Sequence, residues 1–328
     1  MRTVLRCFLA IVLLPALAVA SAQAMDLKFA IATPHGHHAT VGMEKALELV
    51  KKYTAGKITG EVFVGGQLIS GERELMEGLQ FGTVDFGLVS TGMMTAYDER
   101  FALFSLPYLF RDVNNAFATC DGPIGDAFAK IVADTSGLKL VGWIMGGTHT
   151  MTTSNRPINT MADIKGLKIR CMENPIITEA WKAYGAVATP MSLGEVFTAL
   201  QQGTIDGQDN SSANTYANKY YEVQKYQVMT QHMIVPGFFV MSQAVYDAIP
   251  DDLKPAFDRA IAEATQFQRE ENARQEAAAV ENMKARGMEI CYPDKTDFIT
   301  AAAPVKEAWI KKMGGEMAQW IDDIQNKY

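Results

Sequence analysis

The sequence predicts an α/β protein of two lobes, with a cleft between the lobes and one long helix that spans both. Three observations lead to this prediction. Segments with the pattern of strands alternate with segments that favour helices, and the motif LQFGTVD (79–85) returns as LQQGTID (200–206). The length of 328 residues also exceeds what one hydrophobic core usually serves. Alternating strands and helices are typical of parallel sheets covered on both faces.

The first half of the chain supplies strand-like and helix-like runs in turn. LKFAIAT (27–33) is an apolar run that predicts a strand, and TVGMEKALELVKKY (40–53) predicts an amphipathic helix with its apolar residues on one side. The alternation continues with a strand at 57–64, a helix at 71–80, a strand at 84–90 and a largely helical segment at 116–135.

The second half continues the alternation and then changes character. Strands are predicted at 138–145, 166–172 and 204–209, and helices at 193–202, 251–287 and 304–327. The segment 251–287 is rich in Ala, Glu, Gln and Arg, which favour helix. Such a helix reaches roughly 50 Å at 1.5 Å per residue, so we expect it to run along both lobes.

The repeated motif predicts where the cleft lies. In both copies a helix ends, Gly82 or Gly203 breaks it, and a short strand follows at once. We interpret the repeat as two lobes of similar architecture, although helix–Gly–strand turns also recur by chance. The strands end at Ser90 and near Asp209–Asn210, and Arg170 stands at the end of a further strand. Because ligands bind outside the carboxyl ends of strands in open α/β sheets, these ends predict a cleft between the lobes.

The chain begins with the pattern of a secretory leader. Arg2 and Arg6 precede the apolar run CFLAIVLLPALAVA (7–20), and SAQA (21–24) follows it. We therefore expect a signal peptide at 1–24, cleaved after Ala24. The run is short for a membrane span, so the mature protein is predicted to be soluble and exported.

Charge and cysteine content exclude some partners. The 37 acidic residues outnumber the 30 basic ones, and since the leader carries two of the arginines, the mature chain keeps 28 basic residues and a net charge of −9. An acidic exported protein is a poor binder of nucleic acid, so none is expected. Cys120, Cys171 and Cys291 match no metal or redox spacing, and we predict no disulfide and no cofactor.

Signals of catalysis are weak. The chain contains no G-x-S-x-G, H-E-x-x-H, Walker-type phosphate loop or C-x-x-C motif, and we predict a protein that is not an enzyme. One alternative stays open, namely a periplasmic enzyme that acts on a carboxylate through His149 and Asp209.

The segment HGHH (35–38) has two interpretations. Three imidazoles within four residues suggest a zinc or copper site, and so a metal-binding protein as a second alternative. Metal sites need three or four convergent ligands, and the other histidines are His149 and His232. The simpler interpretation is a solvated strand-to-helix loop whose last residues help to cap the helix. His35 is expected at the mouth of the cleft, because it follows the first strand.

Five ordered motifs resemble those of a known family. The chain is similar to the DctP-type solute-binding proteins of tripartite ATP-independent periplasmic (TRAP) transporters. The resemblance runs from about Leu27 to beyond Gly237. The motifs that carry it are GERELMEGLQFGTVDFGLVSTG (71–92), FSLPYLFRD (104–112), TTSNRPINTMADIKGLKIRCMENP (152–175), TPMSLGEVFTALQQGTIDGQDN (189–210) and YYEVQKY (220–226).

The resemblance implies a fold, a function and an anchor residue. It implies the two-lobed periplasmic binding protein fold, which closes over a small organic acid in the periplasm and delivers it to the membrane subunits of the transporter. The arginine of the LKIR motif (167–170) is the shared anchor, so Arg170 is expected to bind the carboxylate of the ligand. Guanidinium suits this role because it is planar, always charged and forms paired hydrogen bonds with a carboxylate.

Other positions follow from the same resemblance. Asn210 retains the family residue, Asp209 stands where Glu is common, Ser90 matches a polar ligand contact, and Glu72 lies on a loop that can reach the cleft. The predicted ligand-binding set is completed by Thr91, Met172, Leu193, His149 and His35.

Two departures from the family pattern narrow the ligand. His149 replaces a second arginine, and Leu193 replaces an aromatic residue. A neutral or switchable histidine makes a second strong carboxylate clamp less favourable. We therefore predict a monocarboxylate rather than a C4-dicarboxylate. The predicted lobes are 25–147 with 236–275, and 148–235 with 276–328, and the protein is expected to be a monomer.

Overall fold

The computed structural model describes residues 24–327, so nearly all of the predicted signal peptide lies outside the described residues. Within this part of the chain, no helix combines the length and the apolar character needed to cross a membrane. The strands are β1 (Met25–Ala30), β2 (Ile58–Phe63), β3 (Phe86–Ser90), β4 (Leu138–Thr153), β5 (Lys168–Cys171), β6 (Val187–Pro190), β7 (Gly207–Ser211), β8 (Tyr226–Ser242) and β9 (Glu289–Cys291).

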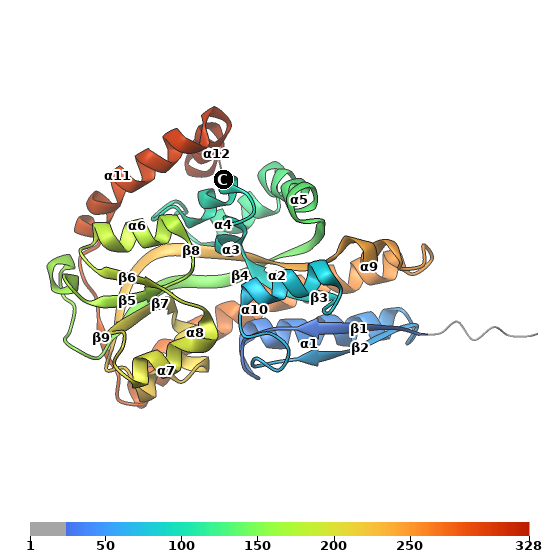
Figure 1. Cartoon of the computed structure of the whole chain (residues 1–328), viewed down its shortest axis with the longest axis horizontal. Coiled ribbons are helices and arrows are strands. Elements are labelled where there is room, and N and C mark those ends of the chain that lie inside the picture. The colour runs from blue at the N-terminus through green and yellow to red at the C-terminus, as the bar shows by residue number, and fades with distance from the viewer. Residues whose placement is uncertain (1–23, 328) are drawn as a thin grey trace, which may run out of the picture.

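Helices cover the sheet formed by these strands on both faces (Figure 1). The α-helices are α1 (His38–Tyr53), α2 (Glu72–Phe81), α3 (Thr91–Met94), α4 (Val113–Cys120), α5 (Pro123–Ser136), α6 (Pro175–Ala183), α7 (Val196–Gln201), α8 (Ser212–Ala217), α9 (Gln243–Asp247), α10 (Lys254–Ala285), α11 (Thr296–Met313) and α12 (Gly315–Asn326). Short 3-10 helices are η1 (Glu99–Ser105), η2 (Met161–Ile164), η3 (Leu193–Glu195) and η4 (Tyr220–Glu222).

The sheet is mixed rather than parallel throughout. Its strand order is β2-β1-β3-β8-β4-β7-β5-β6, and β9 pairs with β8. The parallel pairing predicted from the sequence is correct within each lobe, where β1 pairs with β2 and β3, and β5 pairs with β6 and β7. It is wrong at the centre, because β8 runs antiparallel to β3 and β4, and β4 runs antiparallel to β7.

Two long central strands join the lobes. β4 has 16 residues and β8 has 17, and they pair along most of their length. The sequence predicted a strand only at 138–145, since the glycines Gly146 and Gly147 resemble a strand end, and predicted none at 226–242. The pairing register shifts between Met145 and Gly147, where Gly147 has a φ of 125° that glycine adopts readily. The strands thus pass from lobe to lobe through an irregular point.

The repeated motif folds in the same way twice. Gly82 and Gly203 both have left-handed φ angles, of 73° and 68°, just after α2 and α7. Asp85 accepts a hydrogen bond from the N–H of Lys28 at 2.7 Å, and Asp206 accepts one from the N–H of Lys168 at the same distance. Equivalent aspartates therefore tie each copy to the first strand of its own lobe, which confirms the predicted repeat.

The long helix α10 contacts both lobes, as predicted. Its first half packs on α1 and its later part on α8. Gln275 bonds the backbone of Gly36 and His38 in the first lobe, and the next residue, Glu276, accepts from the N–H of Ala213 in the second. The contacts of α10 therefore pass from the first lobe to the second between Gln275 and Glu276.

Other predicted boundaries needed correction. The helix predicted at 116–135 is two helices, because α4 ends before Gly122 and α5 begins at Pro123. The helix predicted at 304–327 is α11 and α12, separated at Gly314, whose φ is 88°. α12 packs on α4 and η1 of the first lobe, and the ring of Trp320 lies 5.2 Å from that of Phe128. The assignment of all of 276–328 to the second lobe did not anticipate this contact.

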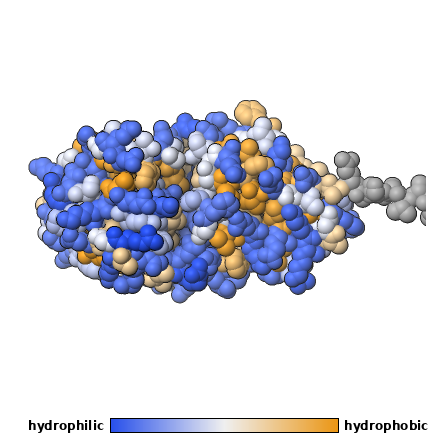
Figure 2. All heavy atoms as spheres, turned by 90° about the horizontal axis from the view of Figure 1, so that it is seen from below, coloured by the Kyte–Doolittle hydropathy of each residue, from blue (hydrophilic) through white to orange (hydrophobic). Residues whose placement is uncertain are grey.

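The core is apolar and the surface largely polar. Fully buried aromatic residues include Phe86, Phe128 and Phe238. Figure 2 shows one face of the molecule, on which hydrophobic residues form patches within a mostly hydrophilic surface. The three described cysteines are free thiols buried in this structure.

Candidate ligand-binding cleft

A cleft with a volume of about 510 Å³ lies between the two lobes. Such a volume suits a small molecule, and more of the lining is apolar than polar. One wall comes from the β1–α1 loop, α2 and β3, and the other from β4, β5, β7 and the loop before α7. The lining includes seven of the ten predicted ligand-binding residues, namely Glu72, Ser90, His149, Arg170, Met172, Leu193 and Asn210.

Arg170 is the main positive group of the cleft. It lies on β5, and only 3% of its surface is exposed. Its Nε and Nη2 donate to the carbonyl of Met191 at 3.0 and 2.8 Å, and Nη1 lies 3.4 Å from the carbonyl of Asp209. Guanidinium has five N–H groups, so these contacts fix the side chain and leave two for another acceptor. A buried guanidinium held in this way is prepared to bind an anion.

Glu72 faces the cleft from the other wall. The hydroxyl and the backbone N–H of Ser90 both donate to its Oε2, at 2.6 and 3.2 Å. Burial raises the pKa of Glu72 above its usual range, although the bonds from Ser90 and the charge of Arg170 act in the opposite direction. Its Oε1 remains available to accept a hydrogen bond from a ligand hydroxyl.

Asp209 does not line the cleft. β7 runs from Gly207 to Ser211, so Asp209 and Asn210 lie inside the strand and not at its end, where they were predicted. Successive strand residues point to opposite faces, and so only Asn210 reaches the cleft. Asp209 is fully buried, and its carboxylate binds His149, Trp181 and His232 instead.

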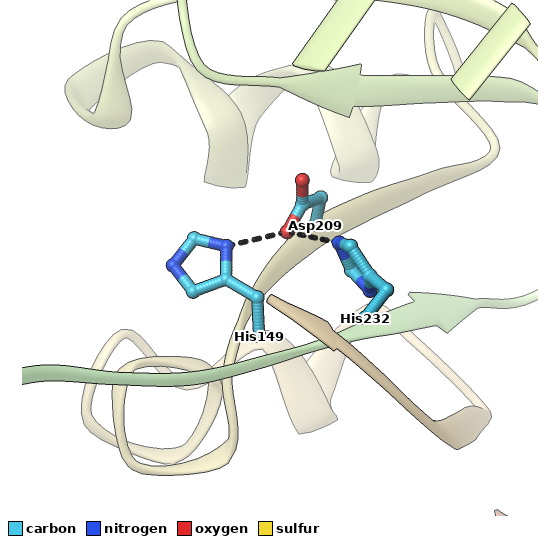
Figure 3. Close-up of side chains that lie close together, drawn as sticks. All are labelled: His149, Asp209 and His232. Carbon is cyan, nitrogen blue, oxygen red and sulfur yellow. Dashed lines mark hydrogen bonds and ion pairs between the residues drawn. The ribbon is translucent and has the colours of Figure 1, made fainter. Parts of the chain in front are cut away.

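His149 connects this buried carboxylate to the cleft. Its Nδ1 lies 2.6 Å from Oδ1 of Asp209, while Nε2 of His232 lies 3.4 Å from the same oxygen (Figure 3). Burial alone would raise the pKa of Asp209, but the attraction of the two histidines and the hydrogen bond of His149 outweigh it and hold that pKa far below its usual range. The carboxylate is therefore ionised and can only accept, so Nδ1 of His149 carries a proton. Figure 3 shows Nε2 of His149 pointing away from Asp209.

The same three residues form the only described group with the composition of a metal site. The ligand atoms of His149, Asp209 and His232 lie within 4.8 Å of one another. Ligands of one tetrahedral zinc ion stand about 3.3 Å apart. The 2.6 Å contact is shorter and has the length of a charge-assisted hydrogen bond. In this structure the two atoms therefore share a hydrogen bond.

Two further predicted residues lie away from the cleft lining. Thr91 is fully buried, and its hydroxyl donates to the carbonyl of Pro236, because it belongs to the first turn of α3 behind the wall. His35 is exposed and its Nδ1 lies 3.3 Å from Glu44, outside the cleft.

The HGHH segment does not converge on a metal ion. His37 caps α1, since its Nδ1 accepts from the N–H of Ala39 at 3.1 Å. His38 is held by Gln268 and Asn272 of α10. The predicted capping role is correct and His35 and Gly36 are exposed, as expected of a solvated loop, but His37 and His38 are buried, at 2% and 1% exposed. Both line the cleft, which the sequence analysis did not predict.

The two walls meet at the rim. Arg73 of α2 and Glu173 after β5 form an ion pair of 2.9 Å. Gly194 approaches Ser70 so closely that a Cβ would lie 2.8 Å from its carbonyl oxygen. These contacts join the two walls at the rim, as expected of a closed form of the protein.

Comparisons with known proteins agree with this geometry. The profile of the bacterial extracellular solute-binding proteins, family 7 (DctP), matches residues 29–312. A solute-binding protein of Verminephrobacter eiseniae is 34% identical over 309 residues, which cover 94% of this chain and 91% of the relative.

Two solved structures of TRAP periplasmic solute-binding proteins have the same fold. One, from Bordetella bronchiseptica, has ligand density interpreted as pantoate, a TM-score of 0.88 and 36% identity, with 93% of this chain and 99% of that chain covered. The other, from Polaromonas, is bound to D-erythronate, with a TM-score of 0.87, 34% identity, and coverage of 92% and 98%.

Proposed function

Because the chain belongs to family 7 of the bacterial extracellular solute-binding proteins, we propose that it captures a hydroxylated acid with a single carboxylate, such as a sugar acid. In this proposal the protein acts as a monomer in the periplasm, binds without turnover, and delivers the acid to TRAP membrane subunits. One observation carries the proposal: Arg170 is buried in a closed cleft with two N–H groups available.

The other charges of the cleft favour one carboxylate over two. Arg73 also lines the cleft, but it is paired with Glu173. Glu72 faces the cleft as an acceptor, and an ionised second carboxylate next to it would be repelled. Hydroxyl groups, in contrast, can donate to Glu72. The pantoate and D-erythronate of the similar structures each combine one carboxylate with hydroxyls.

The predicted lobe boundaries support closure by a hinge. They fall at 147/148, 235/236 and 275/276. The first two coincide with the irregular pairing of β4 with β8, where Gly147 opposes Val235. The third separates Gln275 from Glu276, which bind different lobes. We propose that rotation at these three points opens the cleft.

Binding measurements on matched acids test the proposal. Calorimetry should give tight binding of D-erythronate or pantoate, and much weaker binding of succinate, which has a second carboxylate, and butyrate, which lacks hydroxyls. Mass spectrometry of the ligand released from freshly purified, denatured protein would identify the natural acid. Equal affinity for succinate and D-erythronate would contradict a single-carboxylate site, and chemical conversion of the bound acid would favour the enzyme alternative.

A further inference from the structure

One polar atom of the cleft lining lacks a partner. Among residues 24–327, a small set of buried side-chain nitrogen and oxygen atoms makes no hydrogen bond, and Nε2 of His37 is the one that belongs to a cleft-lining residue. His37 is 2% exposed, so water does not reach this nitrogen freely. A buried polar atom without a partner is costly, and a ligand that supplies the partner removes that cost.

The helix cap fixes which nitrogen carries the proton. Nδ1 of His37 accepts a hydrogen bond from the N–H of Ala39, so it has no proton of its own. Burial lowers the pKa of His37 to about 3, and the ring is therefore neutral at physiological pH. A neutral imidazole carries one proton, which must be on Nε2. The ring of His38 packs against that of His37, tilted by 35° with the ring centroids 4.1 Å apart, and helps to hold its orientation.

We propose that His37 determines specificity by donating a hydrogen bond from Nε2 to an uncharged oxygen of the bound acid, a hydroxyl or a carbonyl. The inference rests on the proposed function and adds a substrate feature to it. Arg170 on β5 selects the carboxylate, whereas His37 precedes α1 on the other wall. A fixed neutral donor adds no charge, so it favours a polar, uncharged end of the ligand.

Glu72 on the same wall makes the pattern more selective. A ligand hydroxyl can accept from Nε2 of His37 and donate to Oε1 of Glu72, whereas a carboxylate can only accept. A methyl group can do neither and would leave Nε2 without a partner. The wall therefore distinguishes a hydroxylated acid from both its deoxy and its dicarboxylate analogue.

Two substitutions separate the cap from the donor. Asparagine places a polar group near Nδ1 and is a good N-cap, so His37→Asn keeps the cap and loses the donor. Glutamine reaches the position of Nε2, so His37→Gln keeps a donor and loses the cap. His35→Asn, on the exposed side of the same loop, is the matched control.

Calorimetry with D-erythronate, pantoate and butyrate gives the first readout. We expect His37→Asn to weaken the binding of the two hydroxy acids about ten-fold and to leave the affinity for butyrate unchanged. Its melting temperature should lie near that of the wild type. His37→Gln should bind the hydroxy acids better than His37→Asn despite a lower melting temperature, and His35→Asn should match the wild type. An equal loss for all three acids, or none for any, would overturn the inference.

Nuclear magnetic resonance of the free protein gives a second, ligand-independent readout. Long-range proton–nitrogen spectra of ring-labelled protein should show the Nε2–H form of His37 from pH 8 to pH 5. A proton on Nδ1, or titration of this ring within that range, would overturn the inference.

Arg170→Lys reports separately on the proposed function, since it should weaken the binding of every acid. Unchanged binding by this variant would reject the carboxylate anchor without altering the result for His37.

Discussion

The two walls of the cleft present the same side chain in opposite ways. His37 on one wall and His149 on the other both use Nδ1 to contact the protein. The partner of His37 is a backbone N–H, so its Nδ1 accepts and its Nε2 carries the proton. The partner of His149 is the carboxylate of Asp209, so its Nδ1 donates. The neighbour of one nitrogen thus decides what the other nitrogen can offer to a ligand.

The two histidines also differ in the charges around them. His37 is buried without an anion beside it, and its pKa is lowered to about 3. His149 contacts the buried carboxylate of Asp209. With its Nδ1 proton directed at that carboxylate, the neutral ring offers a lone pair at Nε2. One wall therefore presents a fixed donor, and the ring on the other wall lies next to a buried negative charge.

The largest expected effect tests whether the wall that carries His149 and Arg170 holds the charged end of the ligand. Arg170→Lys keeps the charge but loses the paired geometry, because an ammonium is a point charge on a flexible stem. We expect a loss of about 2–5 kcal/mol in binding free energy, which is ~30-fold or more in affinity. Calorimetry with D-erythronate measures it, and an unchanged dissociation constant would remove Arg170 from the site.

The next effect tests the buried carboxylate of Asp209, to which Nδ1 of His149 donates its hydrogen bond. Asp209→Asn removes a charge that binds two histidines and Trp181, and should lower the free energy of unfolding by about 2 kcal/mol at pH 7. Since the folded pKa of Asp209 lies below the unfolded value, its contribution is present above about pH 4 and is lost as pH falls through the folded pKa.

Urea unfolding at several pH values checks this prediction. The stability difference between wild type and Asp209→Asn should be constant from pH 7 to pH 5 and narrow below pH 4. A difference that grew on acidification would mean that the carboxylate is not ionised in the folded protein.

The smallest effect concerns the helix that joins the walls. Burial raises the pKa of Glu276 to about 7, against the hydrogen bonds it accepts near Ala213. A raised folded pKa means that the folded protein binds more protons than the unfolded one, so stability falls as pH rises from about 4.5 to about 7. Glu276→Gln should abolish this fall and raise the melting temperature by ~2 °C at pH 8, with no change at pH 4.5. Calorimetric scans at both pH values decide it.

The sequence predicted the plan of the fold well where the signal was local. Gly82 and Gly203 end the two repeated helices, and the alanine-rich composition of α10 favours a helix along its whole length. Both signals act over a short stretch of chain. β8 escaped prediction because Pro236 and Gly237 interrupt it, and only pairing with β3 and β4 keeps it extended. Gly146 and Gly147 likewise look like an end, although β4 continues to Thr153.

The residues of the cleft lining were predictable where a motif marks them, and less so where local geometry decides. Arg170 was expected in the cleft because it stands at a strand end and matches the anchor of the LKIR motif, and it lies in the cleft lining. Asp209 was assigned to the cleft together with Asn210 because both were placed at a strand end, but inside β7 successive side chains point to opposite faces and only Asn210 lines the cleft. In the HGHH segment, His35 was predicted to line the cleft and His37 was not. The composition of the segment does not distinguish its three histidines, whereas the hydrogen bond from Ala39 turns the ring of His37 into its position in the structure.

The position of β8 in the sheet has a consequence for how the chain acquires its structure. β8 lies between β3 and β4, and Val89 of β3 pairs with Phe238 of β8. β3 therefore gains its second neighbouring strand only after β8 has been synthesised. During synthesis the first lobe therefore exposes an unpaired strand edge until most of the chain has been made. Pairings between such distant residues are slow to form. We expect the folding rate to be set by the arrival of β8, with neither lobe folding independently beforehand.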